Sequence, residues 1–185
     1  MITNRQLLLT AAFVAALTFL GVLTFAVFQA RKREIGSRKT ISAFDWISLE
    51  RTECFGSCPA YRMTVTSTGD VTFEGYSSVA CVGTRRKHID SKTIQKLTDA
   101  LNQASVLGFR DSYRNELDGC PSLWTDNPSA ITTVSINGQV KRINHYHGCQ
   151  EVDANAPERE KPYPAQLTLL EDRIDEILET GDWVR

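Results

Sequence analysis

An uncharged apolar run near the N-terminus is the feature that most constrains this chain. Residues 7–28 read LLLTAAFVAALTFLGVLTFAVF and contain no charged side chain. As an α-helix with a rise of about 1.5 Å per residue, this segment would extend over roughly 33 Å, which is enough to cross the hydrocarbon core of a bilayer. The sequence therefore predicts a single transmembrane helix whose partner is the lipid bilayer.

Other interpretations fit the run less well. A cleaved signal peptide has a shorter apolar region, about 7–15 residues, and ends at a small-x-small site. The nearest cut, after Ala30, would place the bulky Phe28 at the first of the two small positions. A buried core helix seldom lacks charge over such a length, and no cysteine near the end of the run supports lipoprotein processing. We therefore expect an uncleaved signal anchor.

The chain divides where its composition changes. Residues 1–30 are the N-terminal tail and anchor, and the charged segment 31–43 predicts a juxtamembrane linker. Residues 44–185 predict one soluble domain, since a domain takes roughly 100–200 residues. The chain is 42% hydrophobic and 23% charged, which excludes a wholly disordered or multi-span protein. A formal net charge of −1 gives no basic excess for binding nucleic acid.

Hydrophobic periodicity in the soluble part predicts an α+β fold. Several segments rich in β-branched and aromatic residues alternate apolar and polar side chains, as half-buried strands do. The expected strands cover 46–49, 61–66, 71–76, 87–89, 131–136 and 140–147. One helix follows the fourth strand and another follows the sixth, which indicates a mainly antiparallel sheet with two helices on one face.

Both expected helices are amphipathic. Ser91 is a suitable N-cap for the first, and Gly108 ends it. The second helix is expected to bury one apolar face and to turn its acidic residues to solvent. Its apolar positions are Leu167, Leu170, Ile174, Ile177 and Leu178, and its acidic positions are Glu171, Asp172, Asp175, Glu176 and Glu179.

The cysteine content favours an oxidising compartment. All five cysteines lie in the soluble part, at Cys54, Cys58, Cys81, Cys120 and Cys149. Cytosolic thiols stay reduced, so this content is more typical of a domain outside the cytoplasm. Spacing alone does not determine connectivity. We expect Cys120–Cys149, which would join the flanks of one predicted hairpin, and Cys54–Cys58, which would close a small loop and leave Cys81 free.

The charges around the anchor favour the opposite orientation. Five basic residues lie between position 31 and position 39, against Arg5 before the run. The positive-inside rule would therefore place the C-terminal part in the cytoplasm. Because the cysteines favour the periplasm, our interpretation is a single-pass inner-membrane protein with an extracytoplasmic domain.

One segment resembles a known family. The stretch Cys54-Phe55-Gly56-Ser57-Cys58-Pro59-Ala60-Tyr61 is similar to the start of an uncharacterised bacterial domain-of-unknown-function family, whose pattern is Cys-Phe-Gly-x-Cys-Pro-x-Tyr. The resemblance covers roughly 46–183 and implies an extracytoplasmic location, because members are commonly secreted or lipid-anchored. It implies no activity. The matching residues are Cys54, Phe55, Gly56, Cys58, Pro59 and Tyr61.

Candidate metal ligands lie at alternate positions along the end of the last expected strand. His145, His147 and Cys149 would point to one face, where imidazole and thiolate could bind zinc. A fourth ligand could come from Cys54, Cys58 or Asp126. The spacing matches no established zinc pattern, so the sequence favours two ordinary histidines on a strand and no metal, with His145 and His147 as the candidates if one is bound.

The sequence favours a membrane-anchored, disulfide-braced binding or interaction module of unknown ligand. The alternative is a thiol- or metal-dependent envelope enzyme that uses Cys81, His145 and His147, with His88 and Asp126 as further candidates. No motif supports a catalytic residue or calls for a cofactor. The basic run at 85–88 is typical of a solvated strand edge.

Overall fold

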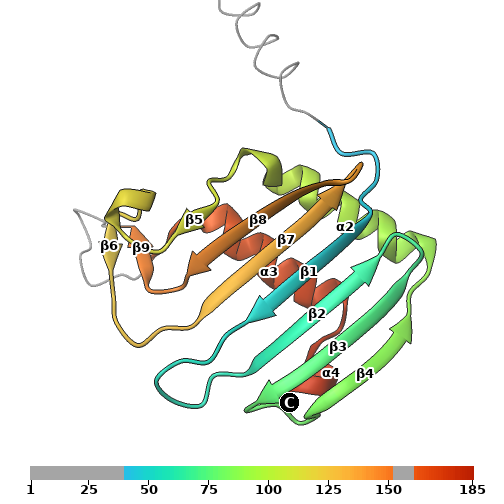
Figure 1. Ribbon diagram of the computed structural model, residues 1–185, viewed down its shortest axis with the longest axis horizontal. Helices are drawn as coiled ribbons and strands as arrows, with labels where there is room; N and C mark the ends of the chain where they lie inside the picture. Colours follow the sequence, from blue (N-terminus) through green and yellow to red (C-terminus); the bar gives the residue numbers. More distant parts are fainter. Residues whose placement is uncertain (1–39, 152–160) are drawn as a thin grey trace, which may run out of the picture. The chain divides into compact units, whose positions relative to one another are not determined.

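In the computed structural model, a seven-stranded sheet forms one layer and two long helices form the other (Figure 1). The strand order is β4-β3-β2-β1-β7-β8-β5, and every neighbouring pair is antiparallel except β8 with β5. These strands are β1 Trp46–Arg51, β2 Ala60–Thr66, β3 Asp70–Ser77, β4 Gly83–His88, β5 Ser112–Tyr113, β7 Ser129–Ile136 and β8 Gln139–Tyr146.

A small second sheet and several helices complete the fold. The second sheet has the order β10-β9-β6, with β6 Ser122–Leu123, β9 Cys149–Glu151 and β10 Lys161–Pro162. The helices are α2 Ser91–Ala104, α3 Ala165–Ile177 and the short α4 Gly181–Val184, with 3-10 turns η1 Val106–Gly108 and η2 Glu116–Asp118. Figure 1 shows α2 and α3 behind the same face of the large sheet. The expected α+β class and mainly antiparallel sheet are confirmed.

The structure describes residues 40–151 and 161–185. The predicted transmembrane segment 7–28 lies outside these ranges. Within them, no helix has both the length and the apolar character needed to cross a bilayer.

The core lies between the sheet and the two helices. Ile47 and Leu49 of the central strand β1 point inward, and Leu49 is flanked across the ladder by Met63 and Thr132. From the helices, Leu101 and Leu167 are fully buried against this layer. Burial of each such side chain stabilises the fold by about 1.5–3 kcal/mol, which explains why strand alternation predicted the inward face correctly.

Two helix boundaries differ from expectation. The N-cap of α2 is Asp90, whose side chain accepts a hydrogen bond from the Thr93 amide, so Ser91 is the first helical residue. The helix ends at Ala104, because Ser105 adopts a left-handed conformation, and Gly108 belongs to η1 instead.

The last expected strand is shifted by one position: it covers Gln139–Tyr146 and not 140–147. His147 and Gly148 form a turn before β9 begins at Cys149. A side chain at Gly148 would collide with the Trp124 carbonyl and the Tyr146 ring, so the chain turns where another backbone segment approaches closely. The prediction that His145, His147 and Cys149 share one strand face is therefore wrong.

The folded unit begins before position 44. Thr40–Arg185 forms one compact unit, and Ile41 is buried in its core. The amide of Ile41 donates to Oδ1 of Asn102 on α2 at 2.7 Å, and the Asn102 amide donates back to the Ile41 carbonyl at 2.8 Å. The last residues of the segment 31–43 thus belong to the domain, although their composition indicated a linker.

Candidate functional site

Charged and imidazole side chains converge between the sheet and α3. His145 projects inward from β8, His147 follows in the turn, and Glu171 lies in the middle of α3. One Glu171 oxygen lies 3.0 Å from Nδ1 of His145, and the other lies 2.9 Å from Nε2 of His147. His145 and Glu171 have fully buried side chains, whereas the side chain of His147 is 23% exposed. The carboxylate therefore links the two imidazoles inside the core.

Arg51 extends this cluster along α3. It is the last residue of β1 and shares the inward face with Ile47 and Leu49. Its Nε and Nη2 both donate to Oδ2 of Asp175, at 3.1 and 2.9 Å, and Nη2 also donates to Asp172 at 3.0 Å. A second arginine nitrogen, Nη1, lies 3.3 Å from Nε2 of His147 and 3.8 Å from Glu171. The arginine thus fixes α3 against the sheet.

Tyr61 completes the cluster on the neighbouring strand. Its hydroxyl donates to Oδ1 of Asp175 at 2.7 Å, and the Thr180 hydroxyl donates to the same oxygen at 3.0 Å. Burial and the Asp175 carboxylate raise the pKa of the Tyr61 phenol, so it remains protonated and available as a donor. Burial tends to lower the pKa of Arg51, but the charges of Asp175 and Glu171 outweigh that effect and raise it.

Glu171 is ionised despite its position. Burial alone would raise the pKa of this carboxyl, yet the hydrogen bonds from His145 and His147 have the larger combined effect and lower it. The core therefore holds a carboxylate whose negative charge is stabilised by its two imidazole neighbours.

The site differs from the one that the sequence predicted. His145 and His147 do come together, but their common partner is Glu171, which was expected to face solvent. Cys149 takes no part, because it is bonded to Cys120. Of the suggested fourth ligands, Cys54 and Cys58 are bonded to each other, and Asp126 accepts a hydrogen bond from Thr125.

Cys81 lies outside the sheet, in the segment between β3 and β4. Its amide donates to the Trp183 carbonyl beside β3 and β4. Four strand spacings, roughly 19 Å in all, separate β3 from the β8 strand that carries His145. His88 is paired with Asp70 at the far end of β4. The fold therefore does not assemble Cys81, His145 and His147 into one site.

Two residues of the site were not predicted, although their positions in the sequence indicate that they face the core. Glu171 follows Leu167 by four positions and precedes Ile174 by three, so helical spacing places it in the middle of the apolar face. Arg51 follows Ile47 and Leu49 at strand spacing. A charged residue at a core-facing position indicates a buried polar network only when it has a partner of opposite charge. The partners of Glu171 and Arg51 are far away in the sequence, so the network could not be predicted.

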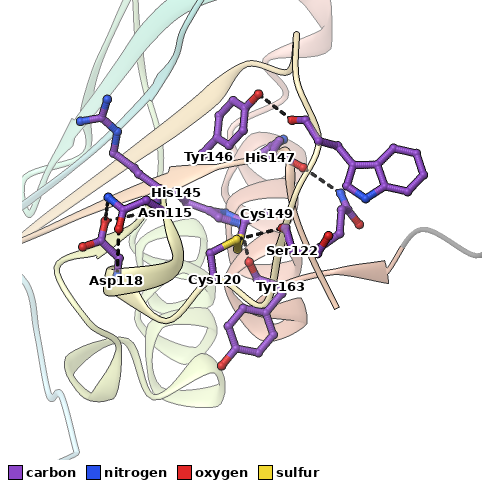
Figure 2. Close-up of a disulfide and its surroundings, with 12 residues drawn as sticks. Asn115, Asp118, Cys120, Ser122, His145, Tyr146, His147, Cys149 and Tyr163 are labelled. Atoms are coloured by element: carbon purple, nitrogen blue, oxygen red, sulfur yellow. Dashed lines mark hydrogen bonds between the residues drawn. A yellow bond between two sulfur atoms is a disulfide. The ribbon is translucent and has the colours of Figure 1, made fainter. Parts of the chain in front are cut away.

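Two disulfides brace one end of the large sheet. At this end β1 ends at Arg51, β2 begins at Ala60, β7 begins at Ser129 and β8 ends at Tyr146; we call it the disulfide end. Cys54–Cys58 closes the β1–β2 loop, and Cys120–Cys149 ties the 110–129 segment to β9. Figure 2 shows the second bond beside His145 and Tyr163. Both expected pairings are present, and Cys81 is the free cysteine.

Most of the exposed large apolar side chains lie at the same end, spread across the width of the sheet. Phe55 is 89% exposed within the Cys54–Cys58 loop, and Leu117 is 94% exposed in η2. Of the eight large hydrophobic residues that are exposed in the described ranges, six lie on strand ends or loops at the disulfide end: Phe55, Tyr76, Val82, Leu117, Leu123 and Trp124. The other two are Val140, in the hairpin at the opposite end, and Leu169, on α3.

The comparisons with known proteins define a family without a function. The chain belongs to the family described as Domain of unknown function (DUF6438), whose model matches residues 45–178. The match spans β1 to the end of α3, so it includes the disulfides, the imidazole–carboxylate cluster and the large sheet. None of the curated proteins compared with the chain matches it significantly.

Proposed function

We propose that the chain is a membrane-anchored, extracytoplasmic binding module of the bacterial envelope, and that it binds its partner through the disulfide end. The observation that carries this proposal is that six of the eight exposed large hydrophobic residues in the described ranges lie at this end, where the two disulfides constrain the β1–β2 loop and the 110–129 segment. Loops on a rigid scaffold are common binding surfaces. Exposed apolar groups that gather in one region favour contact with another molecule.

The same disulfides support the proposed compartment. Such bonds persist outside the cytoplasm and are rare within it. The apolar segment 7–28 supports a tether to the inner membrane. A tethered domain is confined near the bilayer, which raises its effective concentration for envelope partners.

Binding is favoured over catalysis by how the reactive side chains are used. Glu171, Arg51 and Asp175 are engaged with one another or with the histidines beneath the sheet. Cys81 lies apart from them, against the Trp183 backbone. A groove between α2 and α3, lined in part by Ala100, Leu169 and Arg173, contains none of these groups.

Two measurements on the full-length chain test the compartment. Alkylation of unreduced, denatured protein from the native membrane is expected to modify Cys81 alone, and all five cysteines are expected to react after reduction. A C-terminal alkaline phosphatase fusion is expected to be active, and a fluorophore that matures only in the cytoplasm is expected to stay dark. Five free thiols with a bright fluorophore would contradict the proposed location.

The binding surface is tested by photocrosslinking in cells. A photoreactive phenylalanine analogue at Phe55 is expected to give a discrete crosslinked product, because Phe55 projects from the disulfide end. The matched control carries the same group at Val140, which is 61% exposed at the opposite end of the sheet. Equal products from both positions, or none from Phe55, would contradict the assigned surface.

A further inference from the structure

We propose that His145, His147 and Glu171 bind a divalent transition-metal ion, Zn²⁺ in the first instance, between β8 and α3. The site goes beyond the proposed binding function and does not depend on it. Its role would be to hold α3 against the sheet at the disulfide end.

The ligand atoms already face one another. Nδ1 of His145, Nε2 of His147 and a carboxylate oxygen of Glu171 all lie within 4.8 Å of one another. Zinc bonds of about 2.0–2.2 Å in tetrahedral geometry require ligand atoms roughly 3.3 Å apart. The observed separations of 2.9 and 3.0 Å between carboxylate and imidazole atoms need to widen by only a few tenths of an ångström.

The hydrogen bond made by Nε2 of His145 indicates the role of Nδ1 on the same ring. Nε2 lies 3.2 Å from the Tyr163 carbonyl, which can only accept, so Nε2 carries a proton. Nδ1 is then the ring nitrogen that faces Glu171, and a cation can take the place of the proton that otherwise joins it to the carboxylate. Donation of the outer nitrogen to a backbone carbonyl is also the usual arrangement of a metal-bound histidine.

The local charge leaves room for a dication. Glu171 and Asp175 carry two largely buried negative charges against the one guanidinium of Arg51, whereas Asp172 is 64% exposed to solvent. The buried part of the cluster therefore has one negative charge in excess, which favours a cation beside Glu171. Asp172 and Asp175 hold Nη2 of Arg51, while Nη1 lies 3.8 Å from Glu171 and 3.3 Å from Nε2 of His147. The guanidinium can therefore act as an outer partner of the ligating carboxylate, and Nε2 of His147 would exchange its contact with Nη1 for the ion.

The donor set and its access favour zinc over other ions. Two imidazole nitrogens and one carboxylate oxygen suit Zn²⁺, whereas Mg²⁺ and Ca²⁺ prefer oxygen ligands throughout. His147 is 23% exposed while the other two ligands are buried. The ion would therefore enter from the side of His147, where water can fill a fourth position.

The test is a zinc titration of the full-length chain in detergent after removal of metal with a chelator. We expect calorimetry and elemental analysis to give one Zn²⁺ per chain. At about a hundredfold excess over the dissociation constant, zinc is expected to raise Tm by about 5–10 °C. Mg²⁺ at the same concentration is expected to leave Tm unchanged.

Matched histidine variants locate the ion. His147→Gln removes a partly exposed ligand and is expected to weaken zinc binding by at least about 100-fold. His88→Gln removes an exposed histidine outside the cluster and is expected to bind zinc like the parent. Co²⁺ bound to the parent chain is expected to show visible ligand-field bands without a thiolate charge-transfer band.

Three outcomes would overturn the site. The first is that the parent chain binds zinc only with a dissociation constant above about 100 µM, or does not bind it. Protons on the imidazoles would then balance the negative charge of the cluster. His147→Gln could bind as tightly as the parent. A thiolate band with Co²⁺ would place the ion at Cys81, and this parent-chain result stands even if the His147 variant fails to fold.

Discussion

The observed site differs from the predicted one because it contains charged residues at core-facing positions. The sequence located both histidines, because imidazoles at 145 and 147 are conspicuous in any pattern. It missed Glu171 and Arg51, since charged side chains on an amphipathic element are ordinarily solvated and their partners here lie far along the chain. Glu171 meets a histidine 26 positions away, and Arg51 meets Asp175 across 124 positions. Pairs of that separation are set by tertiary structure, which periodicity does not encode.

Replacement of Arg51 tests this network. Arg51→Met preserves the aliphatic stem but leaves Asp175 and Glu171 without their cation, and loss of one member of a buried ion pair costs about 3–5 kcal/mol. The matched control is Arg62→Met. Arg62 pairs with Glu50 on the outer face with 44% of its side chain exposed, so its loss is expected to cost less than about 1 kcal/mol. Urea unfolding of both variants measures the difference, and equal losses would show that Arg51 is solvated in solution.

At the scale of elements, length decided what could be predicted. Strands of six residues or more and both long helices were found from their periodicity, with ends shifted by a few positions. β5, β6 and β10 have two residues each and β9 has three. Strands this short cannot show the alternation of apolar and polar residues that identifies a strand. β5 and β6 join the segment 110–129 to β8 and β9, so two short ladders and Cys120–Cys149 hold a segment that its sequence predicted to be a long irregular loop.

The two disulfides should differ in how much they stabilise these elements. Cys120–Cys149 spans 29 positions and Cys54–Cys58 spans four. Because the entropy that a crosslink removes from the unfolded chain grows with loop length, the double serine variants are expected to lose about 3.5 and about 2 kcal/mol respectively. Burial of Cys120 and Cys149 adds to the first loss, since two hydroxyls would replace a buried bond. Denaturant unfolding without reductant measures both values, and a larger loss for Cys54–Cys58 would contradict this ranking.

For the whole molecule, the fold class was predictable and the strand order was not. Alternation and helical spacing identify strands and helices, and their sequence order indicated a layered α+β domain. Nothing local states that β1 lies between β2 and β7, a pairing that joins residues as far apart as Trp46 and Ser135. The same long-range pairing places Arg51, Ala130 and His145 in one row across the sheet. The strand order brings the residues of the candidate site together. The site could therefore not be predicted before the strand order was known.

The start of the domain gives a final prediction about the whole molecule. A chain that begins at Thr40 should fold without the N-terminal segment, because Thr40–Arg185 forms a unit of its own. A chain that begins at Phe44 lacks Ile41, which is buried and doubly hydrogen-bonded to Asn102. Since loss of a large buried aliphatic side chain costs about 2–5 kcal/mol, the shorter chain should unfold at lower urea concentration with an unchanged slope. Asn102→Ala in the longer chain should reproduce part of this loss, because it removes the two hydrogen bonds that hold Ile41 against α2. Identical urea midpoints for the two chains would show that the domain begins at Phe44 and that Ile41 contributes nothing to its core.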